Sequence, residues 1–187
     1  YNYASVIYIK GALVLNMLRH YMGDERFYAG MQEYFRRYRY GNVTSTMFRE
    51  VMAEYASEGL VQFFQQWVYE AGYPRLCVEQ LSGGAEDHLR IRVRQLQTER
   101  GWGLYEMPFD VRVITHGGDT LDVTRWVHMQ NEDVLEIREV RHEDVASWEL
   151  DPAGYMLVEY VRPTDVPTLP PSAMPFTVYA NRGESAS

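Results

Sequence analysis

The sequence predicts an α+β fold in which an N-terminal helical bundle segment of about four helices is followed by an antiparallel β-sandwich. The first observation behind this prediction is a change of period near Pro74. Apolar residues recur at helical spacing before Pro74 and alternate with polar residues after it. The second observation is that turn signals punctuate the latter part at short intervals, as is typical of sandwiches. At 187 residues, 46% of them hydrophobic, the chain can bury one large core or two small ones.

The first two predicted helices span residues 8–21 and 25–39. The first is apolar on most of its faces, which indicates a buried helix. Gly23 is expected to end it, and Asp24 can cap the second helix. The second helix carries one apolar stripe that is expected to face the other helices: Phe27, Met31, Tyr34, Phe35 and Tyr38.

Two further helices are predicted before Pro74. Thr44 or Ser45 can cap the earlier one, and Gly59 separates it from the later one. Gly72 is expected to supply a C-cap at the end of the helical part, and Pro74 forbids its continuation. The two apolar stripes are Phe48, Val51, Met52 and Tyr55 in one helix, and Leu60, Phe63, Phe64, Trp67 and Val68 in the other.

Residues 75–161 are predicted to form about seven short strands. Within residues 89–96 apolar residues alternate with arginines, which indicates a half-buried strand with an exposed basic face. The sequence His-Gly-Gly-Asp at residues 116–119 predicts a hairpin turn. The sequence Asp-Pro-Ala-Gly at residues 151–154 predicts a second turn.

These patterns divide the chain into a helical part at 1–74, a sandwich at 75–161 and a Pro-rich tail at 162–187. The prolines of the tail exclude a regular helix or a central strand, so the tail is either free or wrapped on an ordered surface. At the other end, the chain starts with Tyr rather than Met and shows no signal-peptide pattern. We therefore expect the natural N-terminus to be missing.

Composition narrows the classes of function. The formal net charge is −8, and the excess of acidic residues falls within residues 75–161, which argues against nucleic-acid binding. No apolar run approaches the roughly 18 residues of a membrane span, so no transmembrane segment is predicted. Cys77 is the only cysteine, which excludes an intramolecular disulfide and a thiolate metal site. Its place in an apolar strand predicts a buried, inert thiol.

The sequence carries no complete catalytic motif of its own. His-Glu-x-x-His, Gly-x-Ser-x-Gly and a phosphate-binding glycine loop are all absent from it. The five histidines lack a second His or Cys at metal-ligand spacing, so no metal ligands are expected in this chain. They are His20, His88, His116, His128 and His142.

Residues 8–12 read Tyr-Ile-Lys-Gly-Ala and lead into an apolar helix that contains Met-Leu-Arg at 17–19. This segment resembles the tyrosine segment of zinc aminopeptidases of the aminopeptidase N and leukotriene hydrolase type, the gluzincins. Further landmarks of that family follow in order as far as residue 74. They are Gly23-Asp24-Glu25-x-Phe27, Tyr34-Phe35, Tyr40-Gly41-Asn42, Thr44, Phe48, Phe63-Phe64-x-x-Trp67 and Gly72-Tyr73-Pro74.

The resemblance implies that this chain is the C-terminal part of a catalytic domain together with the following sandwich. In such enzymes two His and one Glu hold zinc, and the Glu of His-Glu-x-x-His activates a water against the N-terminal peptide bond. Tyr8 would be the catalytic tyrosine that stabilises the oxyanion, and Tyr3 would be substrate-proximal. The implied partners are peptide substrates and the upstream zinc-binding part of the same protein. Without that part this chain is expected to bind no zinc and to be inactive.

Two alternatives belong to other functional classes. The complete protein could be a family member that lost its zinc site and serves as a scaffold or protein-binding module, which only the upstream sequence decides. The sandwich could instead bind an exposed ligand such as a sugar or a protein, although core packing is the favoured role for most of its aromatic residues. The aromatic residues considered for such a site are Trp102, Tyr105, Trp126 and Trp148.

Overall fold

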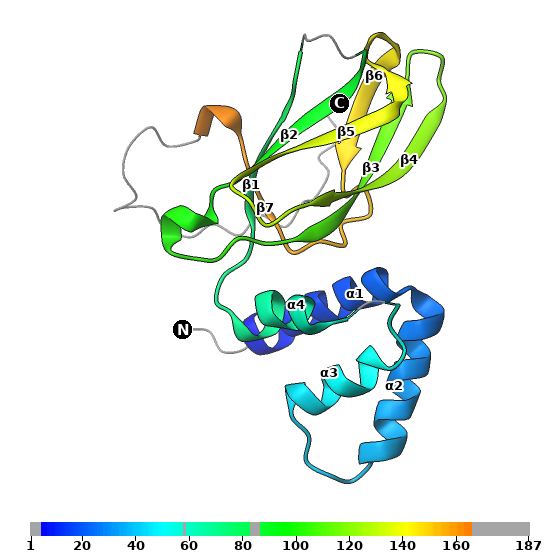
Figure 1. Ribbon diagram of the computed structural model, residues 1–187, viewed down its shortest axis with the longest axis vertical. Helices are drawn as coiled ribbons and strands as arrows, with labels where there is room; N and C mark the ends of the chain where they lie inside the picture. Colours follow the sequence, from blue (N-terminus) through cyan, green and yellow to red (C-terminus); the bar gives the residue numbers. More distant parts are fainter. Residues whose placement is uncertain (1–4, 58, 83–86, 166–187) are drawn as a thin grey trace. The chain divides into compact units, whose positions relative to one another are not determined.

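The computed structural model describes residues 5–57, 59–82 and 87–165, except for the side chains of residues 5–7 (Figure 1). The chain forms two compact units, Tyr1–Ala71 and Gly72–Ser187. The expectations for Tyr3 and for the Pro-rich tail from residue 166 onward lie outside the described residues. No helix within the described ranges is long and apolar enough to cross a membrane.

The described part of the first unit contains four α-helices and two π-helical segments, one directly before α1 and one directly after α4. The aromatic rings of Tyr34, Phe48 and Phe64 form a continuous series, with centroids 5.0 and 5.9 Å apart. Each fully buried apolar side chain contributes about 1.5–3 kcal/mol, so this packing rather than helix propensity stabilises the short helices. In chain order the elements are η1 (Ser5–Lys10), α1 (Gly11–Met22), α2 (Asp24–Tyr38), α3 (Ser45–Ala53), α4 (Val61–Phe64) and η2 (Gln65–Tyr69).

The predicted helix caps are partly right. The prediction for Thr44 is confirmed, because its hydroxyl accepts the N–H of Met47 at 3.3 Å. The prediction for Asp24 is wrong. Gly23 is the N-cap, and the Asp24 carboxylate instead accepts two hydrogen bonds from Arg19, each 2.7 Å long. Asp24 still lies in the first turn of α2, where the helix dipole favours a negative charge.

Two other expectations for the helical unit are also wrong. Phe35 belongs to the predicted buried stripe of the second helix, yet it is 62% exposed, while Phe27 on the same stripe is buried. Gly72 does not cap a helix, because η2 already ends at Tyr69 with Glu70 in the C-cap position. In η2 the hydrogen bond spans one residue more than in an α-helix, and the last one, from the N–H of Glu70 to the carbonyl of Gln65, ends the helix before Gly72.

The second unit contains two sheets, with strand orders β5-β2-β1-β7 and β4-β3-β6. Every described pairing is antiparallel except that of β1 with β7, so the antiparallel sandwich predicted from the sequence is confirmed, with one parallel pair at the edge of the first sheet. The strands are β1 (Arg75–Gln80), β2 (His88–Gln95), β3 (Met107–Thr115), β4 (Thr120–Val127), β5 (Glu132–Arg141), β6 (Val145–Leu150) and β7 (Glu159–Val161). Short 3₁₀ turns lie at η3 (Gln97–Arg100), η4 (His142–Asp144) and η5 (Pro163–Asp165).

Both predicted turns are confirmed. In the hairpin between β3 and β4 the N–H of Thr115 donates to the carbonyl of Asp119 at 2.9 Å, and Gly118 takes the positive φ that the turn requires. In the second turn the N–H of Gly154 donates to the carbonyl of Asp151 at 2.9 Å. The Asp151 carboxylate also accepts the N–H groups of Tyr155 and Met156, both at 2.8 Å.

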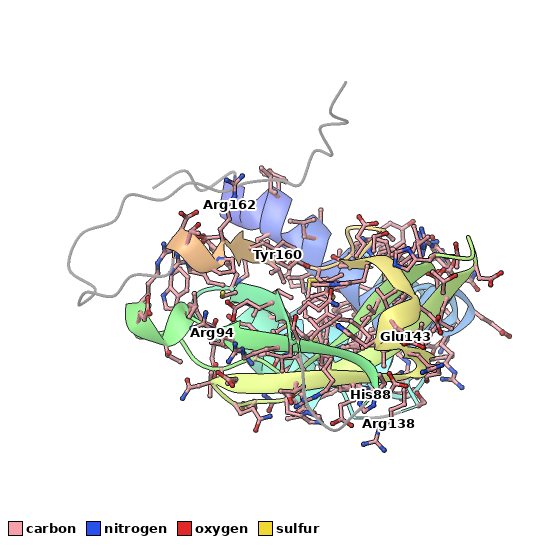
Figure 2. All side chains as sticks on the ribbon, turned by 90° about the horizontal axis from the view of Figure 1, so that it is seen from above. His88, Arg94, Arg138, Glu143, Tyr160 and Arg162 are labelled. Atoms are coloured by element: carbon pink, nitrogen blue, oxygen red, sulfur yellow. The ribbon has the colours of Figure 1, made fainter. Side chains whose placement is uncertain are left out.

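Strand β2 shows how alternation builds the sandwich. Its inward residues are buried in the core, and its outward residues begin with His88 and end with Arg94, which lie near opposite ends of the strand (Figure 2). The predicted basic face is only half-exposed, because Glu79 on β1 lies 3.3 Å from Arg92 and 3.5 Å from Arg94. Arg94 also covers Cys77, which is free and fully buried as predicted.

The segment at residues 72–74 is tied to the body of the sandwich. Gly72 has φ +101°, and a Cβ there would lie 2.5 Å from the indole of Trp102. The ring of Tyr73 lies 5.2 Å from that indole, and its hydroxyl donates to Glu159 of β7 at 3.4 Å. Glu159 also pairs with Arg75 of β1 at 3.0 Å. Gly72, Tyr73 and Arg75 therefore each make a specific contact with another part of the sandwich.

We expect Gly72→Ala to lower the free energy of unfolding of the sandwich by about 2–4 kcal/mol, since it combines a strained φ with overpacking against Trp102. Urea denaturation measures this loss. Gly118→Ala is the matched control, because Gly118 has φ +89° but open space around it, and should cost only about 1 kcal/mol. Equal losses in the two variants would show that contact with Trp102 is not what requires glycine at position 72.

Candidate active-site segment

Tyr8 lies in η1, directly before α1, and 74% of it is exposed. Ile9 and Leu15 are also exposed, at 60% and 40%, and Leu15 shares a helical face with Ala12, which is exposed as well. The opposite face of α1 is packed, with Val14, Met17, Leu18 and Met22 buried. The expectation of a helix buried on most of its faces is therefore only half met. The described residues of the helical unit cover one apolar face of this helix and leave the other in solvent.

The backbone around Tyr8 is π-helical, a rare geometry that occurs frequently at functional sites. The turn ends at Lys10, and Gly11 begins the regular α-helix. Lys10 is half-buried, and this burial lowers the pKa of its ammonium group below the ordinary value, because the charged form loses hydration. The local structure thus places a partly desolvated lysine two residues after an exposed tyrosine.

A cavity of about 510 Å³ lies within the helical unit beside this segment. Its apolar walls are formed by Val14 and Leu18 of α1, Phe48 of α3, Phe63 of α4 and Trp67 of η2. Lys10 and Ser45 are among its few polar members. Sequence reasoning did not predict this cavity, although a helix that is apolar all round is a signal that two separate faces need partners.

Among the described residues, no group of three or more His, Cys, Asp or Glu side chains could hold a metal ion. His128 is engaged by Asp133, at 2.7 Å between Nδ1 and Oδ2. The described part of the chain therefore supplies a candidate hydroxyl donor, Tyr8, but no zinc-binding set.

The four aromatic residues considered as a ligand surface have different environments. Tyr105 is buried in the core at 1% exposure, as core packing predicts. Trp102 packs on Gly72 and Tyr73, and Trp148 donates its indole N–H to Gln80 at 2.7 Å. Trp126 is 38% exposed. The structure does not bring these four side chains together into one site.

The comparisons with known proteins bear on the same N-terminal segment. Residues 1–67 match the peptidase family M1 domain. Over 75 residues the chain is 36% identical to aminopeptidase N of Lactococcus lactis subsp. cremoris, a match that covers 40% of this chain and 9% of that protein. The segment carrying Tyr8 falls within the matched residues.

Longer but weaker similarities reach into the sandwich. Over 159 residues the chain is 24% identical to aminopeptidase M1-C of Oryza sativa subsp. japonica, covering 83% of this chain and 18% of that protein. The crystal structure of Legionella pneumophila aminopeptidase A in complex with aspartic acid matches with a TM-score of 0.67 at 20% identity. That match covers 85% of this chain and 18% of that one. It supports the α+β fold, and the chain spans less than a fifth of each of these relatives.

The one-sided packing of α1 predicts unequal effects at two leucines of the same helix. Leu18 is 1% exposed, so Leu18→Ala should lower the free energy of unfolding of the helical unit by about 2–5 kcal/mol. Leu15→Ala, at a position 40% exposed, should cost less than about 1 kcal/mol. Thermal unfolding followed by far-ultraviolet circular dichroism compares the stabilities of the two variants. Similar losses would mean that both faces of α1 are packed in the isolated chain.

Proposed function

We propose that the complete protein is a zinc-dependent aminopeptidase that removes N-terminal residues from peptides with a zinc-activated water. The observation that carries this proposal is Tyr8, exposed in η1 directly before α1, within the segment that matches family M1 peptidases. The relatives named above are aminopeptidases, which supports the same class of reaction. In this proposal Tyr8 is the residue of this chain that acts on the reacting atoms.

The role proposed for Tyr8 follows from the chemistry of peptide hydrolysis. Attack of water on the peptide carbonyl places negative charge on its oxygen, and a neutral phenol O–H can donate a hydrogen bond to that oxygen. Zinc, when bound, would activate the water and polarise the carbonyl. Its ligands would come from upstream of this chain, since the described residues contain no ligand set. A donor fixed to the start of a helix needs little reorganisation as the charge develops.

The uncovered side of α1 supports the second part of the proposal, in which this chain packs against the upstream zinc-binding part of the same domain. The exposed side chains of Ile9 and Leu15, together with the apolar cavity, form a surface that is costly to leave in water. Covering that surface would bring the zinc-binding part close to the N-terminal end of α1, directly after the turn that carries Tyr8.

Tyr8→Phe in the complete protein removes only the hydroxyl, so kcat should fall about 100- to 1000-fold. Zinc content and thermal stability should stay unchanged, because the side chain is exposed in the helical unit. Tyr28→Phe is the control: Tyr28 is 50% exposed on α2 and should retain full activity. Unaltered peptidase activity in Tyr8→Phe would rule out the assigned role.

Metal analysis of the complete protein separates the proposal from the alternative of a zinc-less scaffold or protein-binding module. We expect about one zinc ion per chain and loss of aminopeptidase activity on removal of the metal with a chelator. A complete protein with neither bound zinc nor activity on aminoacyl p-nitroanilides would favour the scaffold.

Fragment complementation tests the proposed packing. This chain alone should not cleave aminoacyl p-nitroanilides, and co-expression with the upstream zinc-binding part should restore cleavage. Leu15→Asp should prevent assembly, whereas Val43→Asp, at a similarly exposed loop position, should not. Tyr8→Phe should assemble but remain inactive. Assembly that tolerates Leu15→Asp would show that this face of α1 is not the contact.

A further inference from the structure

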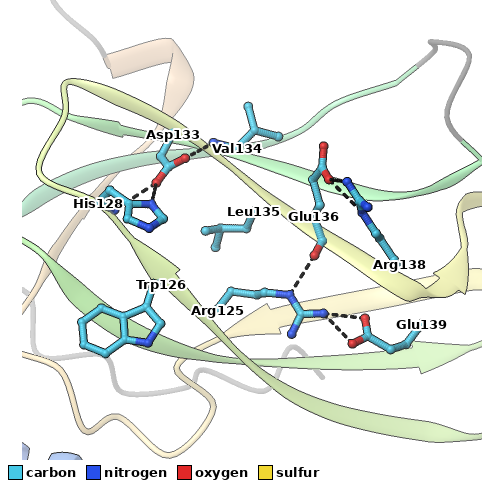
Figure 3. Close-up of a pocket in the computed structure, with 9 residues that line it drawn as sticks. All are labelled: Arg125, Trp126, His128, Asp133, Val134, Leu135, Glu136, Arg138 and Glu139. Carbon is cyan, nitrogen blue, oxygen red and sulfur yellow. Dashed lines mark hydrogen bonds and ion pairs between the residues drawn. The ribbon is translucent and has the colours of Figure 1, made fainter. Parts of the chain in front are cut away.

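A second hollow, of about 430 Å³, lies on the sandwich between β4 and β5 (Figure 3). These two strands are the edges of different sheets, so the hollow sits at an open side of the sandwich. In Figure 3, Trp126 and His128 lie on one side of it, Glu136 and Arg138 on the other, and Leu135 between them. Its volume falls within the range of small-molecule sites. Nothing in the aminopeptidase proposal uses it.

Arg125 is held rigidly at the edge of this hollow. Its Nε donates to the carbonyl of Glu136 on β5 at 2.7 Å, and one terminal nitrogen donates to the carbonyl of Thr124 on β4 at 3.0 Å. The other terminal nitrogen donates to the carboxylate of Glu139 at 2.6 Å. A guanidinium fixed by three partners needs no ordering when a ligand arrives.

His128 and Asp133 are fixed at the opposite edge. The Asp133 carboxylate accepts the backbone N–H groups of His128 and Val134, at 2.9 and 2.8 Å, as well as Nδ1 of His128. Burial alone raises the pKa of Asp133, but the hydrogen bonds from His128 and Val134 outweigh it and hold that pKa below its ordinary value. With Nδ1 engaged, Nε2 is the ring nitrogen of His128 left to face a ligand, and the imidazole is 64% exposed.

The apolar part of the hollow consists of Trp126, Val134 and Leu135. Trp126 is 38% exposed and presents part of its indole ring, while Leu135 is buried at 3% and closes the floor. A ligand would therefore need one apolar face to lie against the ring and polar groups around its rim.

The charges around the hollow select the chemistry of such a ligand. Its carboxylates disfavour an anion and its guanidinium groups disfavour a cation. Each carboxylate already has a partner: Glu139 pairs with Arg125, Glu136 with Arg138, and Asp133 with the imidazole of His128. Hydroxyl groups both donate and accept, so they fit a rim of mixed donors and acceptors without adding charge. We propose that this hollow binds a neutral, hydroxyl-rich ligand, a sugar of one or two rings, stacked on Trp126.

Titration of the ¹⁵N-labelled chain with D-glucose, D-galactose, maltose and cellobiose tests the proposal. At least one sugar should bind with a dissociation constant of about 1 mM or tighter, and shift resonances of Trp126 and His128. Trp126→Ala should weaken that binding at least about tenfold. His128→Gln, which changes an exposed side chain, should also weaken it. Trp148→Phe is the control, because Trp148 lies on β6 and does not line the hollow.

Any of three outcomes with the sugars, or a response to a peptide in their place, would overturn the proposal. One is that none of the four sugars shifts Trp126 or His128. Another is that the shifts map outside residues 125–139. The third is that binding is as tight in a folded His128→Gln or Trp126→Ala protein as in the parent chain. Trialanine should leave the same resonances unmoved, and a response to this peptide in place of the sugars would also contradict the assignment.

Discussion

The packing of α1 is the constraint on which the proposed site depends. The helix is apolar on nearly every face, and the described helical unit buries only one of them, through Val14, Met17 and Leu18. The buried face fixes the axis and rotation of the helix, because α1 packs against α2 and the ring of Tyr21 lies 5.7 Å from that of Phe63 on α4. Once the rotation is fixed, the exposed face follows by helical geometry. Tyr8 is therefore presented by the same contacts that stabilise the unit, rather than by interactions of its own.

Much of the architecture was predictable because strand and helix periods are local properties of sequence. The alternation in β2, the cap at Thr44 and the turn at Gly118 each rest on a few adjacent residues. The errors arose where distant or competing partners decide. Asp24 pairs with Arg19 instead of capping a helix. The parallel pairing of β7 with β1 is a further detail that the predicted antiparallel sandwich did not include. Neither outcome is visible in a window of adjacent residues.

The candidate sites divide in the same way. Tyr8 could be named from sequence because it lies inside an ordered series of motif residues. The hollow on the sandwich could not, since Trp126 and Glu136 belong to edges of different sheets. The burial of two glutamines and their hydrogen-bond partners could not be predicted from the sequence either. Gln95, at 3% exposure, exchanges two hydrogen bonds with the backbone of Tyr105, and Gln97 accepts the N–H of Arg75. Such polar groups are tolerated in a core only when tertiary structure satisfies them.

The parallel pairing of β1 with β7 has a consequence for how the sandwich forms. Its first strand, β1, is hydrogen-bonded to β7, the last strand of the described residues, and Glu159 closes this pairing with Arg75 and Tyr73. Contacts between residues so distant in sequence carry a large loop-closure cost and form late in folding. During synthesis, the edge of β1 therefore stays open until residue 161 has left the ribosome. The sandwich is a unit that is completed only by its final strand.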